Sequence, residues 1–200
     1  SDTLARTFDR MLQLLTQMDY VEWPEGAEPT ITEEGLRLAQ IHNGSDLLVA
    51  TCLRRGIWDD LDPAELAGAV SSLVFENRKA SQGSDEVPTE PLAKALGNTY
   101  RIWEELSEDE RRYRLPVTNL PDMAFATAIH QWTAGAPLGY CLQAAAESGA
   151  ELTPGDFVRW CRQVIDLLQQ IKKTGYSTDI RDKSAEAIQA IRRGVVALNN

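Results

Sequence analysis

The sequence lacks the features that mark exported, membrane-spanning and disulfide-stabilised proteins. It has no run of about 18 apolar residues, which a membrane-spanning helix would need, and its first residues lack the basic-then-apolar order of a signal peptide. The cysteines Cys52, Cys141 and Cys161 are odd in number and far apart, so they do not predict a disulfide framework. We therefore expect a cytoplasmic protein, without membrane contact, that builds its core without cross-links.

Motifs for catalysis and for metal binding are also missing. No Gly-x-x-x-x-Gly-Lys-Ser/Thr phosphate loop occurs, so we expect no catalytic residue, no ATP hydrolysis and no cofactor in this chain. His42 and His130 are the only histidines, and neither has a Cys, His or carboxylate at metal-ligand spacing. The acidic group Asp59–Asp62 is explained better by helix capping than by calcium binding, since Ala64 stands where a calcium loop needs glycine. A metal site is therefore not predicted.

Basic residues are few over most of the chain. Residues 1–150 carry 24 acidic and 12 basic side chains, a net charge of −12, whereas residues 151–200 carry 6 acidic and 8 basic side chains, a net charge of +2. Contacts with phosphates need clustered lysine and arginine. The balance argues against a free-standing nucleic-acid-binding protein and assigns any contact with a polyanion to the last fifty residues.

The apolar spacing predicts an all-α protein, a multi-helix bundle of about eight helices. Apolar residues recur at intervals of three and four along most of the chain, which places them on one face of each helix. Two helix starts, Asp62-Pro63 and Thr153-Pro154, combine an N-capping side chain, a proline in the first turn and an acid three residues after the cap. The predicted helices cover residues 4–18, 33–42, 46–55, 63–76, 92–112, 122–133, 138–147, 154–174 and 179–197.

Two intervals depart from the helical pattern. Short β-prone pieces at 20–23 and 29–32 flank turn residues and predict a small N-terminal hairpin. From Asn77 to Pro91 the apolar signal gives way to Ser, Gly, Asp, Glu and Pro, which predicts a solvated loop, flexible over 79–91. We expect the hairpin to be the only β structure.

The five tryptophans are spread along the chain in a way that favours packing over stacking on nucleic-acid bases. All five are expected to anchor the core: Trp23, Trp58, Trp103, Trp132 and Trp160. Exposure of Trp58 stays open as an alternative, because it stands beside Gly56 and a group of acids.

The helix predicted at 154–174 carries a polar stripe along one side. With an advance of 100° per residue, its opposite side is apolar from Phe157 to Ile171 and must be packed. Guanidinium groups bind phosphate, while amide and carboxylate groups hydrogen-bond base edges or the ribose hydroxyl, so the stripe suits a single strand of RNA. A polar face that only serves solubility would give the same pattern. The candidate RNA-binding residues are Arg159, Arg162, Gln163, Asp166, Gln170 and Lys173.

Two segments resemble the DSHCT domain that ends helicases of the Ski2-like group. The first contains Thr32–Ala39, then Asp46–Ala50 and Cys52-Leu53-Arg54, then Gly56, Trp58 and Leu61–Ala67. The second, Gly155–Leu168 followed by Ile191–Ala197, is similar to the end of bacterial HelY-type ATP-dependent RNA helicases.

The resemblance implies a non-catalytic domain that works within a larger helicase. Residues 32–200 would form a helical bundle on two RecA-like motor domains, which would hold ATP and Mg²⁺, and residues 1–31 resemble the end of a winged-helix region. The helix at 154–174 would be the ratchet helix, which guides single-stranded RNA as it leaves the motors. In eukaryotic relatives an Arg and a Glu on this helix contact bases; they align with Gln163 and Asp166, and neither identity is kept. We expect a monomer, since no heptad pattern extends beyond one helix.

Two other functions stay open. The acidic surface of residues 1–150 suits a protein–protein interaction scaffold that docks a basic partner. The helices at 122–133, 138–147 and 154–174 could also form a helix-turn-helix DNA reader. The second alternative is the weaker one, because its reading helix carries Asp156 and Asp166.

Overall fold

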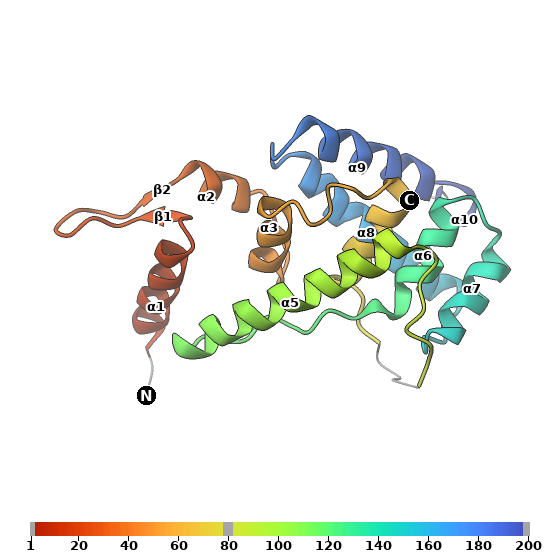
Figure 1. Cartoon of the computed structure of the whole chain (residues 1–200), viewed down its shortest axis with the longest axis horizontal. Helices are drawn as coiled ribbons and strands as arrows, with labels where there is room; N and C mark the ends of the chain where they lie inside the picture. Colours follow the sequence, from red (N-terminus) through yellow and green to blue (C-terminus); the bar gives the residue numbers. More distant parts are fainter. Residues whose placement is uncertain (1–2, 78–81, 198–200) are drawn as a thin grey trace.

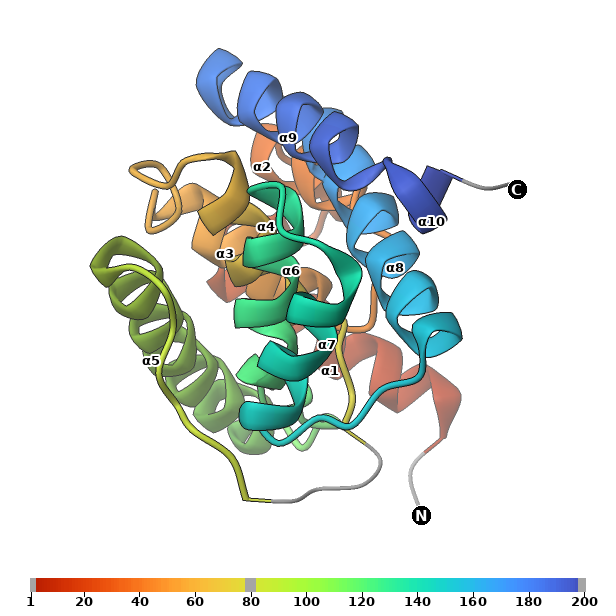
Figure 2. The same cartoon turned by 90° about the vertical axis from the view of Figure 1, so that its right-hand side faces the viewer.

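The computed structural model of the chain describes residues 3–77 and 82–197. Within them the predicted all-α bundle with a small N-terminal hairpin is confirmed (Figures 1 and 2). The hairpin pairs β1 (Val21–Glu22) with β2 (Thr30–Ile31) in antiparallel register. The helices are α1 (Leu4–Gln17), α2 (Glu33–Leu38), α3 (Asp46–Arg54), α4 (Pro63–Ser71), α5 (Glu90–Arg112), the 3₁₀ turn η1 (Met123–Phe125), α6 (Ala126–Thr133), α7 (Leu138–Glu147), α8 (Pro154–Lys172), α9 (Thr178–Ile191) and α10 (Gly194–Ala197).

The helix α4 lies at the centre of the bundle. It packs against α5, α6, α8 and α9, and its residues from Glu65 to Ser71 are all buried. A helix that is apolar around its whole circumference must be surrounded by others. The hydroxyls of Ser71 and Ser72 fit this interior because they donate to the carbonyls of Gly68 and Ala69 (2.7 Å each).

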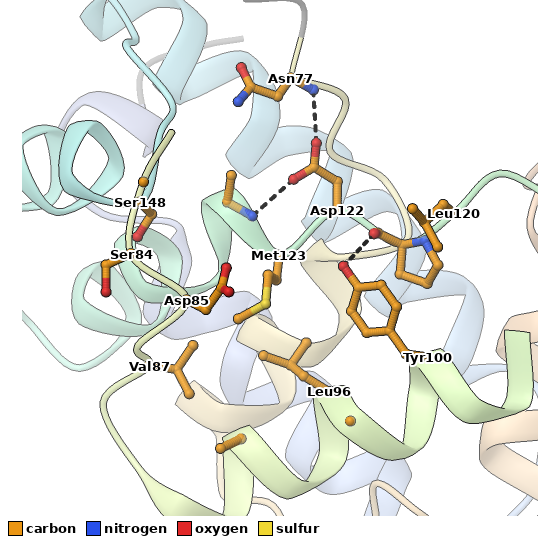
Figure 3. Close-up of a pocket in the computed structure, with 15 residues that line it drawn as sticks. Asn77, Ser84, Asp85, Val87, Leu96, Tyr100, Leu120, Asp122, Met123 and Ser148 are labelled. Atoms are coloured by element: carbon orange, nitrogen blue, oxygen red, sulfur yellow. Dashed lines mark hydrogen bonds between the residues drawn. The ribbon is translucent and has the colours of Figure 1, made fainter. Parts of the chain in front are cut away.

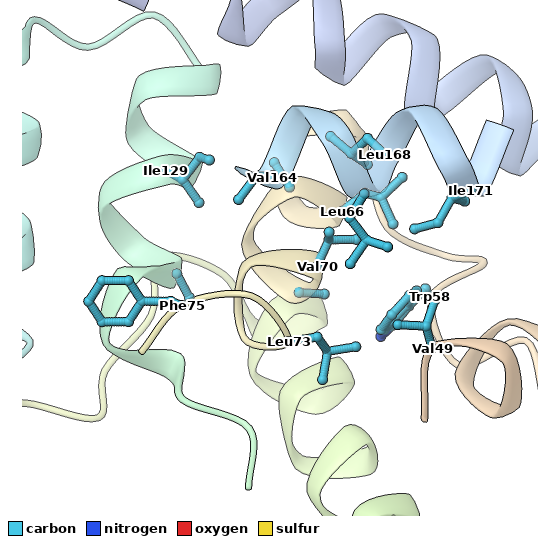
Figure 4. Packing of buried hydrophobic residues seen from close by; sticks show 14 of the residues in the cluster. Val49, Trp58, Leu66, Val70, Leu73, Phe75, Ile129, Val164, Leu168 and Ile171 are labelled. Carbon is cyan, nitrogen blue, oxygen red and sulfur yellow. The ribbon is translucent and has the colours of Figure 1, made fainter. Parts of the chain in front are cut away.

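A single core joins α4 to its neighbours. Figure 4 shows Leu66 and Val70 of α4 between Val49 of α3, Ile129 of α6 and Leu168 of α8. At one end of this core, aromatic rings pack edge to face or stacked, with centroids 5.0–5.5 Å apart. The rings are those of Phe75, Phe125, Trp132, Phe157 and Trp160. The helix α8, which carries the predicted stripe, is therefore held on a rigid support.

Three helix ends differ from the prediction. The helix α4 ends at Ser71 instead of residue 76, because tighter hydrogen bonds such as Leu73 N–H to Val70 O (3.0 Å) turn the chain and bring Phe75 into the aromatic cluster. The helix α2 ends at Leu38 instead of residue 42, and the predicted helix 179–197 is divided after Ile191. Apolar periodicity continues through these turns, which is why it overestimates the helix length.

The loop predicted from Asn77 to Pro91 ends two residues earlier than expected. Thr89 caps α5, so Glu90 and Pro91 already belong to that helix. The backbone before it is tied down: Ser84 N–H donates to Glu147 O (2.8 Å), and Glu86 O accepts from the Thr127 hydroxyl (3.2 Å). Residues 78–81, on which part of the prediction falls, lie outside the described residues.

The prediction that the tryptophans are core anchors is confirmed at Trp58 and wrong at Trp23. Trp58 is fully buried, and its indole N–H donates to the hydroxyl of Thr99 in α5 (3.2 Å). Gly56, with φ +69°, turns the chain back after α3 so that Trp58 points inward. Trp23 in the hairpin is 39% exposed and is not a core anchor.

Candidate nucleic-acid interface

The helix α8 begins at the residue that the sequence marks. The Thr153 hydroxyl accepts from Asp156 N–H (3.1 Å), and the Asp156 carboxylate accepts from Thr153 N–H (3.4 Å), which completes the capping box. These bonds, with burial against α9 and α4, fix the rotation of the helix. Its buried face consists of Phe157, Cys161, Val164, Ile165, Leu167, Leu168 and Ile171.

The six candidate residues lie together on the opposite face, which we call the α8 stripe. Gln170 is half-buried, and the other five are exposed: Arg159, Arg162, Gln163, Asp166 and Lys173. The helical spacing therefore placed each of them on the accessible side of α8. Their contact with RNA stays a prediction.

Arg159 is held at the start of the stripe without being covered. Its guanidinium forms an ion pair with Asp156 (3.0 Å) and lies 5.8 Å from the centroid of the Trp160 ring, while its side chain stays 56% exposed. Hydrogen bonds from Thr153, first from its backbone and then from its hydroxyl, lower the pKa of Asp156, and Arg159 lowers it further. An exposed ion pair is worth little in water, so a phosphate group can displace Asp156 from Arg159.

Gln170 has a structural role in addition to its place on the stripe. Its Oε1 accepts from the backbone N–H of His42 (2.5 Å), and its Nε2 donates to Asp166 (3.2 Å). The amide thus ties the turn between α2 and α3 to α8 and orients the Asp166 carboxylate. Both ends of Gln170 already have protein partners, so we expect Asp166 to contact a ligand more directly than Gln170 does.

A pocket of about 460 Å³ lies beside the stripe, between α8 and α10. Neither Gln169 nor Arg192, which line it, belongs to the set predicted from the sequence. The signal that could have found Arg192 is the pair Arg192-Arg193 directly after α9, in the basic part of the chain. The full lining is Arg162, Ile165, Asp166, Gln169, Arg192, Val196 and Ala197.

A larger pocket, of about 690 Å³, lies at α5 and the turn before α6 (Figure 3). Both oxygens of Asp122 accept backbone hydrogen bonds there, from Asn77 (3.1 Å) and Ala124 (3.0 Å), and the Tyr100 hydroxyl donates to Pro121 O (2.6 Å). Burial, then the charges of Asp122 and Asp85, raise the pKa of Tyr100. The described residues around this pocket include no lysine or arginine. It is therefore a poor place for a phosphate backbone.

The titratable side chains give no candidate metal centre in the part of the chain that is described. No group of three or more His, Cys, Asp or Glu side chains there could hold a metal ion. Burial raises the pKa of the Cys52 thiol to about 12 and that of Cys141 to about 11, and it lowers the pKa of His130. Both thiols thus stay protonated, which leaves them without nucleophilic character. Among the described helices, none is long and apolar enough to span a bilayer.

Exposed apolar side chains concentrate at the N-terminal end. Of the eight large apolar residues that are exposed in the described chain, five fall within the first 36 positions. The helix α1 is strongly amphipathic, yet Leu14 is its only buried residue, and Leu4 and Phe8 are 88% and 62% exposed. These five residues belong to α1, the hairpin and α2, and we call them the N-terminal apolar residues: Leu4, Phe8, Trp23, Ile31 and Leu36. Exposed apolar side chains of this size suit contact with another domain.

Comparison with known proteins shows that this chain is similar to parts of helicases. Residues 28–198 match the family described as the DSHCT (NUC185) domain. The chain is 44% identical, over its whole length, to a probable helicase HelY of Mycobacterium tuberculosis and 43% identical to that of Mycobacterium leprae. A chloroplastic DExH-box ATP-dependent RNA helicase of Arabidopsis thaliana is 26% identical over 76% of the chain.

The matches cover only a part of each relative. The chain spans 22% of the length of the two mycobacterial proteins and 13% of the length of the plant protein. The part that it matches is the C-terminal region of these helicases.

Proposed function

Because this chain belongs to the DSHCT (NUC185) domain family, we propose that it is the non-catalytic helical domain of a cytoplasmic, Ski2-like ATP-dependent RNA helicase. In this proposal the α8 stripe guides single-stranded RNA as it leaves two RecA-like motor domains. ATP and Mg²⁺ belong to those motor domains, and this chain supplies contacts to the strand. The observation that carries the proposal is the exposure of Arg159 and Arg162 on α8 and of Lys173 at its C-cap.

The mixture of side chains on the stripe supports guidance of a strand better than tight binding. Three cations attract the phosphates, while Gln163 and Asp166 between them offer hydrogen bonds to bases or ribose hydroxyls. Arg159 already has an intramolecular ionic partner in Asp156, so exchanging it for a phosphate changes the free energy only modestly. Weak, replaceable contacts of this kind allow a strand to move from one set of contacts to the next.

The overall charge of −10 is compatible with this role if the rest of the helicase confines the strand. Acidic surfaces repel RNA from most of the domain, and screening limits this repulsion to roughly 8–10 Å at physiological salt. The α8 stripe lies in the part of the chain with a net charge of +2. We therefore expect RNA contact to depend on the full-length protein.

Reversing the charge at two positions tests this role. In the full-length protein, Arg159→Glu with Lys173→Glu should weaken binding of single-stranded RNA about tenfold and lower RNA-stimulated ATP hydrolysis. The slope of log affinity against log salt should fall by about 1.4, since each lost phosphate contact removes roughly 0.7. Both quantities are measured by a salt series of fluorescence-anisotropy titrations and by steady-state ATPase assays.

The matched control places the same charge change on another helix. Arg101→Glu with Arg112→Glu alters two exposed residues of α5, which lies apart from α8 (Figure 2). The control should retain RNA affinity close to that of the unmodified protein. An equal loss of RNA affinity in both variants would show that the effect comes from net charge alone. No loss of affinity in the stripe variant would rule out guidance by α8.

The exposure of the N-terminal apolar residues supports contact between this domain and the rest of the same helicase. Phe8→Ser in the full-length protein should lower the free energy of unfolding by about 2 kcal/mol, because a buried phenylalanine contributes roughly that much. The comparison is Leu120→Ser, which removes an apolar residue of similar exposure, 57%, at another surface. Thermal and denaturant unfolding measure both variants. If the free energy of unfolding falls by less than about 0.5 kcal/mol in both Phe8→Ser and Leu120→Ser, Phe8 stays solvated in the full-length protein.

A further inference from the structure

The α9–α10 turn is anchored by one arginine and leaves the next one exposed. The Arg193 guanidinium stacks on the Trp132 ring at 3.7 Å from its centroid. Its Nη2 donates to the carbonyls of Trp132 (2.6 Å) and Ala136 (2.7 Å). Arg193 is thereby committed to the turn between α6 and α7. Its neighbour Arg192 points to solvent beside α8.

The turn then returns the chain onto α8. Gly194 has φ +50°, and a Cβ atom at this position would meet the Trp132 ring at 3.3 Å, so the close approach and the backbone angle both favour glycine. The short helix α10 follows, packs on α8 and buries Val196. The pocket between α8 and α10 is therefore built by specific contacts and is not an accidental gap.

The lining of this pocket combines an apolar floor with polar groups of both kinds. Ile165 and Val196 are buried and offer a surface for a flat ring. Arg162 and Arg192 supply hydrogen-bond donors, and Asp166 supplies acceptors. Its volume of about 460 Å³ lies within the range of small-molecule sites, roughly 300–1,000 Å³.

We propose that this pocket receives one guanine base of the RNA strand that the α8 stripe guides. The inference rests on the proposed function, because it needs a strand lying along α8. A guanine presents two adjacent N–H donors on its Watson–Crick edge, which a carboxylate such as Asp166 accepts, and it presents O6 and N7 acceptors, which an arginine such as Arg192 binds. Uracil presents one N–H between two carbonyls, and a carboxylate repels those carbonyls.

The Asp166 carboxylate is already oriented for this contact. Its Oδ2 accepts from Gln170 Nε2 (3.2 Å), and Gln170 is in turn fixed by the backbone N–H of His42. A carboxylate oxygen has two acceptor sites, so the bond to Gln170 leaves capacity for a base. The fixed orientation lowers the entropy that binding would cost.

Two single-stranded probes test the pocket with the full-length protein. One is a uridine-only RNA, and the other is the same RNA with evenly spaced guanosines. The unmodified protein should bind the guanosine-containing strand about tenfold more tightly, since a good bidentate base contact discriminates by roughly 1–3 kcal/mol. Arg192→Ala and Asp166→Asn should each reduce this preference to less than about threefold.

A third variant addresses the pocket itself and not its charges. Val196→Trp places a large ring in the pocket and should abolish the guanosine preference, measured as the ratio of the affinities for the two probes. Circular dichroism checks that the variant is folded. If it is not, the decision rests on Arg192→Ala, which alters an exposed side chain.

The outcomes separate the pocket from the guidance role. No guanosine preference in the unmodified protein, or a preference unchanged in Arg192→Ala and Asp166→Asn, overturns the pocket. An equal loss on both probes in Arg192→Ala also overturns it, because Arg192 would then be a general phosphate contact. The variant with Arg159→Glu and Lys173→Glu, which leaves the pocket lining intact, should lose affinity for both probes. If this variant keeps its affinity for both probes, the guidance role itself fails.

Discussion

Trp58→Ala is expected to lower the free energy of unfolding by about 3–5 kcal/mol, as large truncations in a core do. Trp58 is fully buried and lies between Val49 of α3 and Leu66 of α4 (Figure 4). Its indole N–H is bonded to Thr99 of α5. The truncation therefore leaves a cavity at the junction of three helices. In a domain of this size the melting temperature should fall by roughly 6–20 °C.

The measurement is denaturant unfolding followed by far-ultraviolet circular dichroism, with two comparison variants. Trp58→Phe keeps much of the ring volume and should lose less than half as much stability as Trp58→Ala. Trp23→Ala removes the partly exposed tryptophan of the hairpin and should cost less than about 1 kcal/mol. A loss below about 1 kcal/mol for Trp58→Ala would contradict the packing of this core.

The complete burial of Trp58 shows which information a local pattern lacks. Its neighbours in the sequence, Gly56 and Asp59–Asp62, are typical of a solvated turn. Burial comes from α5, whose Thr99 lies 41 positions further along the chain. A partner at that separation leaves no periodicity around residue 58, so local spacing cannot reveal it.

Features that depend on nearby residues could be predicted well. The starts of α4 and α8 fall at Pro63 and Pro154, as their caps indicate. Each capping box joins side chains three positions apart, so the sequence contains both partners. The ends of α4 and of α9 depend on tertiary contacts of Phe75 and Arg193, and for that reason they were predicted too far along the chain.

The candidate site also has one part that local spacing predicts and another part that it does not. The α8 stripe lies on one helix, so the rotation of 100° per residue was sufficient to collect its six members on one face. Arg192 and Gln169 meet only because α10 returns onto α8, and the bond between His42 and Gln170 joins positions 128 apart. Neither arrangement has a local signal that predicts its geometry.

Arg193→Ala is expected to lower the free energy of unfolding by about 2–4 kcal/mol. The substitution leaves the carbonyls of Trp132 and Ala136 without a charged donor, a contact worth roughly 1.5–3 kcal/mol, and it removes the stacking on the Trp132 ring, worth roughly 0.5–2 kcal/mol. The free energy of unfolding of Arg193→Lys should fall between that of the unmodified protein and that of Arg193→Ala, because an ammonium group cannot stack as a planar guanidinium does. Thermal and denaturant unfolding measure the three proteins.

The adjacent Arg192→Ala is the matched control, and it separates stability from binding. Arg192 is exposed, so its removal should change the free energy of unfolding by less than about 0.5 kcal/mol while it reduces the guanosine preference. Arg193→Ala should reduce that preference as well, because α10 is no longer held on α8. An Arg193→Ala protein as stable as the unmodified one would show that the turn does not depend on this contact. The pocket would then lack the anchor from which its shape was inferred.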